Sequence, residues 1–236
     1  MPPLLLIHTN FITAFQNFLS NHVEEILIFF YIFFPSFVYT KNHITTQEEI
    51  ILLSKKILYY DPKDINALSR FRRDFLDHIQ QKCKKNQPLV LICVGTDRAT
   101  GDCLGPIIGQ SLINSKIYSV YGTLQNPVHA KNLNLTLDHI HTIYKNPFII
   151  AIDSCLGCRK HVGYITLSSM PLLPGQGVLK RLPPIGDLSI TGIVDVFSDS
   201  DCETIQRTRL KIVFELASFI ACGIETPTFQ ASYPHL

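Results

Sequence analysis

The stretch that decides the fold of this chain is Leu89-Val-Leu-Ile-Cys-Val94, which is followed by Gly95-Thr-Asp-Arg-Ala-Thr-Gly-Asp102. Six consecutive apolar residues bounded by turn residues are typical of a strand that is buried on both faces of a parallel sheet. The segment after this strand predicts a loop, and Cys103–Ile113 has the pattern of a helix. A buried strand, a loop and a helix in this order predict an α/β fold.

Strand and helix patterns alternate on either side of this unit. An acid followed by a proline predicts a helix that begins at Asp61. Further strands are expected at residues 118–121, 147–153 and 162–168, and further helices at 132–144 and 203–222. This alternation predicts a mostly parallel sheet with helices packed on both of its faces.

The composition excludes several classes of protein. The 236 residues are 46% hydrophobic and 17% charged, which is too apolar for a disordered protein and too poor in charge for a coiled coil. The formal net charge is +2, so no basic excess favours binding to nucleic acid. Seven cysteines spread over a long chain indicate reduced thiols and a cytoplasmic protein rather than a secreted disulfide framework.

Residues 1–50 form an apolar N-terminal extension that differs from the single α/β domain expected at residues 55–226. Its apolar run, Ile26–Val38, would be roughly 20 Å long as a helix, which is short of the ~30 Å hydrocarbon core of a bilayer. No Lys or Arg precedes Lys41, so the segment is a poor secretory signal. Three interpretations stay open: a disordered tail or a start assigned too far upstream, a membrane-associated anchor, and a packed element. Membrane contact is expected only if this segment belongs to the protein.

Two acids are expected at the edge of the sheet where strands of an α/β fold present their ligands. Asp102 lies in the loop after the strand 89–94, and Asp153 ends the strand 147–153. Two neighbouring carboxyl groups can share a proton, so that one deprotonates water and the other protonates a leaving amine. They can instead hold a divalent metal whose bound water attacks. Each acid taken alone also fits a turn or helix cap.

Other motifs are less specific. Cys155-Leu-Gly-Cys158 suggests zinc or redox chemistry, but no second cysteine pair accompanies it, and it follows a strand instead of opening a helix. The loop 95–105 lacks the Gly-Lys-Ser/Thr ending of a P-loop and the spacing of a dinucleotide-binding turn. No cofactor is therefore expected from motifs, and a divalent metal at Asp102 and Asp153 stays the alternative.

Several long motifs in order resemble the YyaC family of spore proteases, over roughly Leu58 to Ile224. The motifs are Val94–Pro106, Tyr121–Ala130, Ile150–Gly157, Pro174–Val178 and Gly186–Gly192. That family is similar to the germination protease and to the hydrogenase maturation endopeptidases. The resemblance implies a phosphorylase/hydrolase-like three-layer α/β/α sandwich.

The same resemblance implies which residues form the site. Both related peptidase groups have one acid after the first strand and a second acid ending a later strand, and these positions are Asp102 and Asp153 here. Thr96 stands where those groups have Asn. His129 and His161 are the nearest counterparts of the metal-binding histidine of the maturation enzymes, and Asp97 and Asp187 are further acids within the matching motifs.

The expected function is that of a sporulation-associated endopeptidase that hydrolyses a protein or peptide substrate, such as a spore protein, with the carboxylate pair Asp102 and Asp153. Thr96, Asp97, His129 and Asp187 are the expected supporting residues. The expected location is the cytoplasm of the sporulating cell or forespore. Two alternatives remain: a non-catalytic sporulation factor, and a metal- or small-ligand-binding protein on the same fold.

Overall fold

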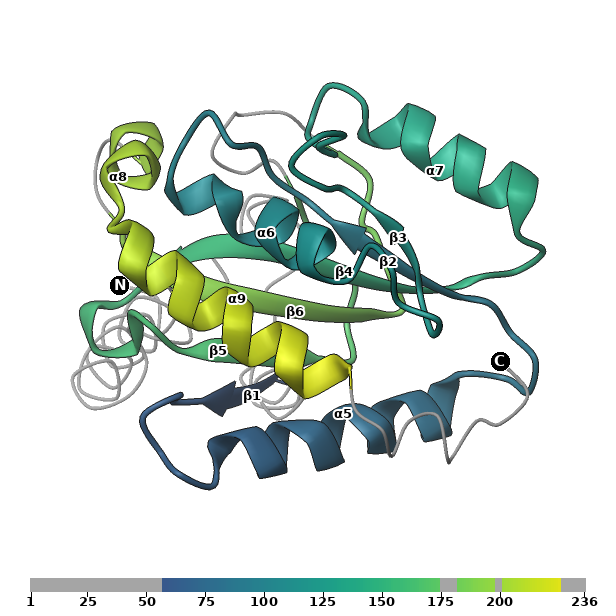
Figure 1. Cartoon of the computed structure of the whole chain (residues 1–236), viewed down its shortest axis with the longest axis horizontal. Helices are drawn as coiled ribbons and strands as arrows, with labels where there is room; N and C mark the ends of the chain where they lie inside the picture. The colour runs from purple at the N-terminus through teal and green to yellow at the C-terminus, as the bar shows by residue number, and fades with distance from the viewer. Residues whose placement is uncertain (1–56, 175–181, 198–200, 226–236) are drawn as a thin grey trace, which may run out of the picture. The chain divides into compact units, whose positions relative to one another are not determined.

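The computed structural model describes residues 57–174, 182–197 and 201–225 (Figure 1). A six-stranded sheet forms its centre, with the strand order β1-β5-β6-β4-β2-β3. The strands are β1 (Ile57–Tyr60), β2 (Leu89–Cys93), β3 (Ser119–Tyr121), β4 (Phe148–Gly157), β5 (Ile165–Ser168) and β6 (Leu188–Val196). The N-terminal extension and most of the motif Pro174–Val178 lie outside the described residues.

The sheet is mostly parallel. Strands β3, β2, β4 and β6 run in one direction, and each is hydrogen-bonded to the next. Strand β5 is antiparallel to β6, and β1 is antiparallel to β5. The expected strand at residues 162–168 is therefore present as β5, and β1 covers the edge that it would otherwise expose.

Helices cover both faces of the sheet (Figure 1). Helices α5 (Ala67–Lys82), α6 (Leu104–Ser111) and α9 (Leu210–Ile224) pack on one face, and α7 (Leu133–Ile143) packs on the other. The short helices η2 (Gly101–Cys103), η3 (Arg159–His161) and α8 (Asp201–Arg207) complete the described elements. The predicted three-layer α/β/α sandwich is confirmed.

Alternation along β2 builds the two halves of the core. Leu89, Leu91 and Cys93 belong to the larger cluster under α5, α6 and α9. Val90 and Ile92 belong to the smaller cluster, together with Leu133 and Ile140 of α7. All five residues of β2 are buried because both faces of the sheet are covered, as the apolar run predicts.

Two helix predictions were wrong in detail. Helix α5 begins at Ala67 and not at Asp61, because the carboxylates of Asp61 and Asp64 accept hydrogen bonds from the backbone N–H groups two residues ahead (3.0 and 2.9 Å). These local turns compete with a helical start. The helix expected at residues 203–222 is divided into α8 and α9, and Thr208 between them is buried and bonds the carbonyl of Thr204 (3.1 Å).

The strand that carries Asp153 is longer than predicted. It was expected to end at this residue, but β4 continues to Gly157 because β6 pairs with it along that whole length. The partner on the other side, β2, ends at Cys93 opposite Ile152. Asp153 therefore lies one residue beyond the end of β2. Within the described residues, no helix is long and apolar enough to cross a membrane.

Candidate active site

The loop after β2 is folded tightly against Asp102. Gly95 has a φ of +136°, and a Cβ atom added there would lie 2.1 Å from the main-chain oxygen of Asp102. The N–H of Thr96 donates to that same oxygen (3.1 Å), and the N–H of Asp102 donates to the carbonyl of Ala99 (3.0 Å). Only glycine fits this backbone at position 95. The loop thereby places Asp102 in the helix η2, directly over the end of β2.

Asp153 is held by the regular pairing of β4. It lies opposite Thr191 of β6, and its Oδ1 accepts a hydrogen bond from the N–H of Ser154 (2.7 Å). Strand β2 no longer shields it on the other side, and the side chain is partly exposed. Asp102 is also partly exposed. Both residues thus retain some accessible surface.

The structure brings Asp102 and Asp153 together. Burial raises the pKa of Asp153 well above its ordinary value, and the negative charge of Asp102 raises it further, although the Ser154 N–H opposes the shift. Burial also raises the pKa of Asp102, against the N–H of Thr96 and the charge of His129. When two like charges lie close together in a poorly solvated site, one group retains its proton. We infer that Asp153 is the protonated member of the pair.

His129 lies beside Asp102, in the segment after β3. When its ring is protonated, the charge lowers the pKa of Asp102. The N–H of Lys131 donates to Nδ1 of His129 (3.3 Å), so the neutral ring carries its proton on Nε2. The neighbouring Val128 accepts a hydrogen bond from the N–H of Gly95 (2.7 Å), so the His129 segment and the Asp102 loop are joined directly.

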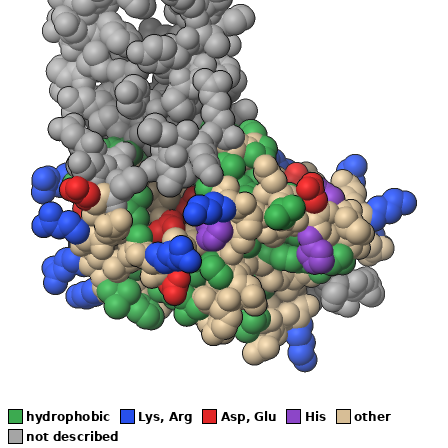
Figure 2. Space-filling view, turned by 90° about the horizontal axis from the view of Figure 1, so that it is seen from above, with side chains coloured by type: hydrophobic (Ala, Val, Ile, Leu, Met, Phe, Trp, Pro, Cys, Tyr) green, Lys and Arg blue, Asp and Glu red, His purple; other side chains and the backbone are tan. Residues whose placement is uncertain are grey.

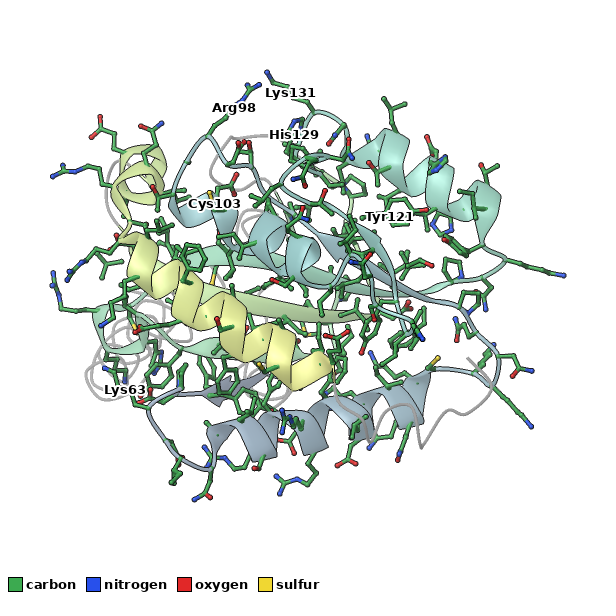
Figure 3. All side chains as sticks on the ribbon, in the orientation of Figure 1. Lys63, Arg98, Cys103, Tyr121, His129 and Lys131 are labelled. Carbon is green, nitrogen blue, oxygen red and sulfur yellow. The ribbon has the colours of Figure 1, made fainter. Side chains whose placement is uncertain are left out.

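The loop also carries Thr96, Asp97 and Arg98. The Thr96 hydroxyl lies 3.4 Å from Oδ1 of Asp97, and the Asp97 side chain is exposed. Figure 3 places Arg98, His129 and Lys131 along the upper edge of the molecule. The view from above shows basic and histidine side chains next to acidic ones on this face (Figure 2). Thr96 and Asp97 therefore belong to the same loop as Asp102, and the backbone N–H of Thr96 donates a hydrogen bond to the main-chain oxygen of Asp102.

Asp187 does not join this group. Its Oδ2 accepts a hydrogen bond from the N–H of Ile149 (2.9 Å), and its own N–H donates to the carbonyl of Ile149 (2.7 Å). Ile149 lies at the start of β4, four residues before Asp153, so Asp187 contacts the opposite edge of the sheet from the one where β2 ends beside Asp153. Lys82 donates to the main-chain oxygen of Asp187 (2.9 Å). Asp187 therefore makes hydrogen bonds to the backbone of β4 at the opposite edge of the sheet.

The cysteines of the Cys155–Cys158 motif bond to different partners. Cys155 donates to the hydroxyl of Thr191 (3.4 Å), and Sγ of Cys158 lies 3.3 Å from Nδ1 of His161. Among the described residues, no group of three or more His, Cys, Asp and Glu is placed to hold a metal ion. Asp102 and Asp153 would supply two ligands, fewer than the three protein ligands of a catalytic zinc site. The residues present do not fit such a centre.

Sequence reasoning missed two features of this edge. Asp195 lies near the carboxyl end of β6, and its Oδ2 is 3.4 Å from the hydroxyl of Thr208. The rule that places ligands at strand ends would have identified it had residues 190–196 been interpreted as a strand. The motif Tyr121–Ala130 also lines a pocket next to His129. Most of the motif lies in the loop after β3, so no periodicity indicated a pocket.

The comparisons with known proteins give a family. A solved structure, the [NiFe] hydrogenase maturation protease HycI from Thermococcus kodakarensis KOD1, matches with a TM-score of 0.40 and 11% identity, over 64% of this chain and 99% of HycI. The uncharacterized protein YyaC of Bacillus subtilis (strain 168) is 46% identical over 140 residues, which are 58% of this chain and 68% of YyaC. The family of proteins of unknown function DUF1256 matches residues 58–223. The predicted relationship to YyaC is confirmed, and the chain belongs to the DUF1256 family.

Proposed function

We propose that this protein hydrolyses peptide bonds with Asp102 and Asp153. One observation carries the proposal: two partly exposed carboxyl groups interact at the carboxyl edge of the sheet, and burial together with the charge of Asp102 raises the pKa of Asp153 well above its ordinary value. A pair with one ionised and one protonated member holds a general base and a general acid ready at neutral pH.

The chemistry follows from these two protonation states. Ionised Asp102 accepts a proton from a water molecule while the water oxygen attacks the carbonyl carbon of the peptide bond. Protonated Asp153 gives its proton to the amide nitrogen as the C–N bond breaks, so that an amine leaves and a carboxylic acid forms. Transfer of the proton from Asp102 to Asp153 restores the starting state. His129 lies beside Asp102 and stabilises its ionised form when the ring is protonated.

A narrower form of this proposal rests on the resemblance of the motifs. The chain belongs to the DUF1256 family and is related to YyaC, and the resemblance of its motifs to spore proteases implies a substrate protein of the sporulating cell. We propose internal cleavage of such a protein in the cytoplasm.

The test uses blocked peptides, because internal cleavage does not need a free terminus. The full chain is incubated with a randomised library of peptides acetylated at the N-terminus and amidated at the C-terminus, and new termini are detected by mass spectrometry. Wild-type protein is expected to cleave, and Asp102→Asn and Asp153→Asn are each expected to reduce the rate by about 10²-fold or more.

The matched control is Asp77→Asn, which makes the same chemical change at an exposed position of α5. It is expected to cleave at the wild-type rate. No cleavage by wild-type protein, or undiminished cleavage by both active-site variants, would refute the proposal. In either case a melting temperature that rises with added divalent ions would favour the ligand-binding alternative.

A further inference from the structure

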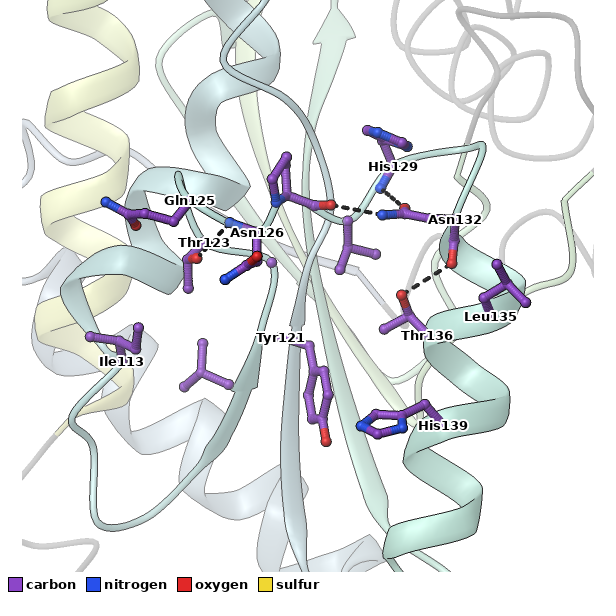
Figure 4. Close-up of a pocket in the computed structure, with 14 residues that line it drawn as sticks. Ile113, Tyr121, Thr123, Gln125, Asn126, His129, Asn132, Leu135, Thr136 and His139 are labelled. Carbon is purple, nitrogen blue, oxygen red and sulfur yellow. Dashed lines mark hydrogen bonds between the residues drawn. The ribbon is translucent and has the colours of Figure 1, made fainter.

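A pocket of about 620 Å³ is lined in part by Val128 and His129. It lies between β3, the loop that follows β3, and helix α7 (Figure 4). Its lining includes Tyr121, Asn126, His129 and His139, and the exposed apolar side chains of Ile113 and Leu135 stand in it as well. A space of this size is in the range of cavities that bind small molecules and peptide segments.

The polar groups of the pocket lining belong to uncharged side chains and to two histidines, His129 and His139. None of its residues is Lys, Arg, Asp or Glu, and its polar groups are hydroxyls, amides and imidazoles. The rings of Tyr121 and His139 meet edge to face with their centroids 6.1 Å apart, which gives one wall an aromatic surface. A charged ligand group placed here would lose its hydration without gaining an ionic partner. An uncharged ligand would bury apolar area and keep its hydrogen bonds.

Hydrogen bonds hold the upper wall of this pocket in place. The side chain of Asn132 donates to the carbonyl of Pro127 (2.9 Å) and accepts from the N–H of His129 (2.8 Å). At the opposite end of the loop, the N–H of Asn126 donates to the hydroxyl of Thr123 (3.1 Å). Figure 4 shows these bonds around the mouth of the pocket. A wall fixed in this way is ordered before the ligand arrives, which lowers the entropic cost of binding.

The pocket and the carboxyl pair share one residue. His129 lines the pocket, and the charge of its ring acts on Asp102. Val128, which also lines the pocket, accepts the hydrogen bond from Gly95 in the loop that carries Asp102. A chain that fills the pocket therefore passes His129 on its way to the carboxyl groups.

We propose that this pocket binds the substrate next to the bond that is cleaved, and that it selects an uncharged segment with an aromatic or amide side chain. The inference rests on the proposed function, because it assigns a substrate class to the same site. The absence of Lys, Arg, Asp and Glu from the lining, the place of His129 in it, and the hydrogen bond that joins Val128 to the Asp102 loop are the observations that carry it.

Binding and cleavage are measured separately to test this. The probes are blocked peptides that differ only at one scanned position, which is Tyr, Gln, Lys or Glu, and binding to the Asp102→Asn variant is followed by calorimetry. The Tyr and Gln peptides are expected to bind more tightly than the Lys and Glu peptides. Leu135→Lys, added to that variant, is expected to improve binding of the Glu peptide by about fivefold, the most that a solvated ion pair gives.

Leu135 suits this change because 72% of it is exposed, so the substituted protein keeps its fold. The matched control is Ile65→Lys, where the replaced side chain is 93% exposed and lies before α5, outside the pocket. An equal response of the two lysine variants to the Glu peptide would overturn the proposal. Failure of every probe peptide to bind at millimolar concentration would overturn it as well.

The outcomes separate the pocket from the chemistry. Suppose that cleavage depends on Asp102, shows no preference for uncharged residues, and is not altered by Leu135→Lys. This result would refute the role of the pocket and would support the peptidase activity. A preference in binding that Leu135→Lys changes, in a protein that cleaves nothing, would support the pocket and refute the peptidase.

Discussion

Two aspartates lie along strand β4, one beside its start and one within it, and their side chains make different interactions. At the start of the strand, the carboxylate of Asp187 accepts a hydrogen bond from the N–H of Ile149, and the N–H of Asp187 donates one to the carbonyl of Ile149. Toward the other end, Asp153 accepts one hydrogen bond from the adjacent Ser154, and the charge of Asp102 acts against its ionisation. Asp187 completes the hydrogen bonding of the sheet. Asp153 lies where its ionised form is unfavourable.

This difference shows how a functional carboxyl group is recognised in a sheet of this kind. A carboxylate that pairs backbone donors lowers the energy of the fold. A carboxyl group that is buried next to a like charge raises that energy, and such arrangements gather at functional sites. We therefore expect substitutions at Asp153 and Asp187 to have opposite consequences for activity and for stability.

The largest expected effect is on activity, in the pair itself. If Asp102 and Asp153 act as one unit, each single change to Asn lowers the cleavage rate by about 10²–10⁴-fold. The double variant is then expected to be no slower than the slower single variant, because the second change removes a unit that is already broken. The measurement is the initial rate of cleavage of one blocked peptide by the wild-type protein, the two single variants and the double variant. Multiplicative losses in the double variant would show that the two acids act independently.

The next effect concerns the loop that positions Asp102. Gly95→Ala forces a Cβ atom against the main-chain oxygen of Asp102 at a positive φ, and we expect a loss of about 3 kcal/mol in the free energy of unfolding. Denaturant titration measures this loss.

The matched control for the loop is Gly163→Ala. Gly163 also has a positive φ (+88°), but a Cβ atom there meets nothing within 4 Å. Only the conformational cost of about 1 kcal/mol is therefore expected. Equal losses in the two variants would mean that the contact with Asp102 does not hold the loop.

Much of this edge was accessible from the sequence. The apolar run of β2 and the loop to Asp102 are local, so pattern alone predicted them. The approach of Asp153 followed from the rule that parallel strands present their carboxyl ends together. The true end of β4 could not be predicted, because its pairing with β6 as far as Gly157 is a contact between distant segments.

Asp187 shows where a motif can mislead. It lies within a motif that resembles the peptidases, and it was expected to support the site. Because it directly precedes β6, which runs parallel to β4, its place at the opposite edge follows from strand direction. The pocket beside His129 depends on the packing of α7 against the segment after β3, which no local pattern encodes.

A smaller effect is expected at Asp187. Asp187→Ala removes the acceptor of the Ile149 N–H and should cost about 1–3 kcal/mol of stability, because a backbone donor is left without a partner. The cleavage rate per folded molecule should stay at the wild-type level. Asp187→Asn retains an acceptor oxygen and should restore most of the stability. If the cleavage rate falls in Asp187→Asn while the fold is intact, Asp187 contributes to catalysis and not only to stability.

The last effect is a pH-dependent gain in stability. The pKa of Asp153 is raised in the folded state by burial and by Asp102, so folding favours its protonated form. Its contribution is fully present below the ordinary carboxyl pKa and is lost as the pH rises through the raised value. Asn cannot ionise. At pH 7 the folded wild-type protein holds a proton that its unfolded state releases, whereas Asn holds none. Asp153→Asn should therefore melt at about the wild-type temperature near pH 4 and at a higher temperature at pH 7, with a difference that grows as the pH rises between these values.

The comparison with Asp77→Asn decides what this gain means. Asp77 is exposed on α5 and its charge acts on His78 alone among the described groups with a shifted pKa, so its replacement should change the dependence of melting temperature on pH much less than Asp153→Asn does. If Asp153→Asn behaved in the same way, the proton would not be held at Asp153, and the assignment of general acid and general base would lose its basis. A gain that grows with pH, in a variant that no longer cleaves, is what a site maintained at the expense of stability predicts.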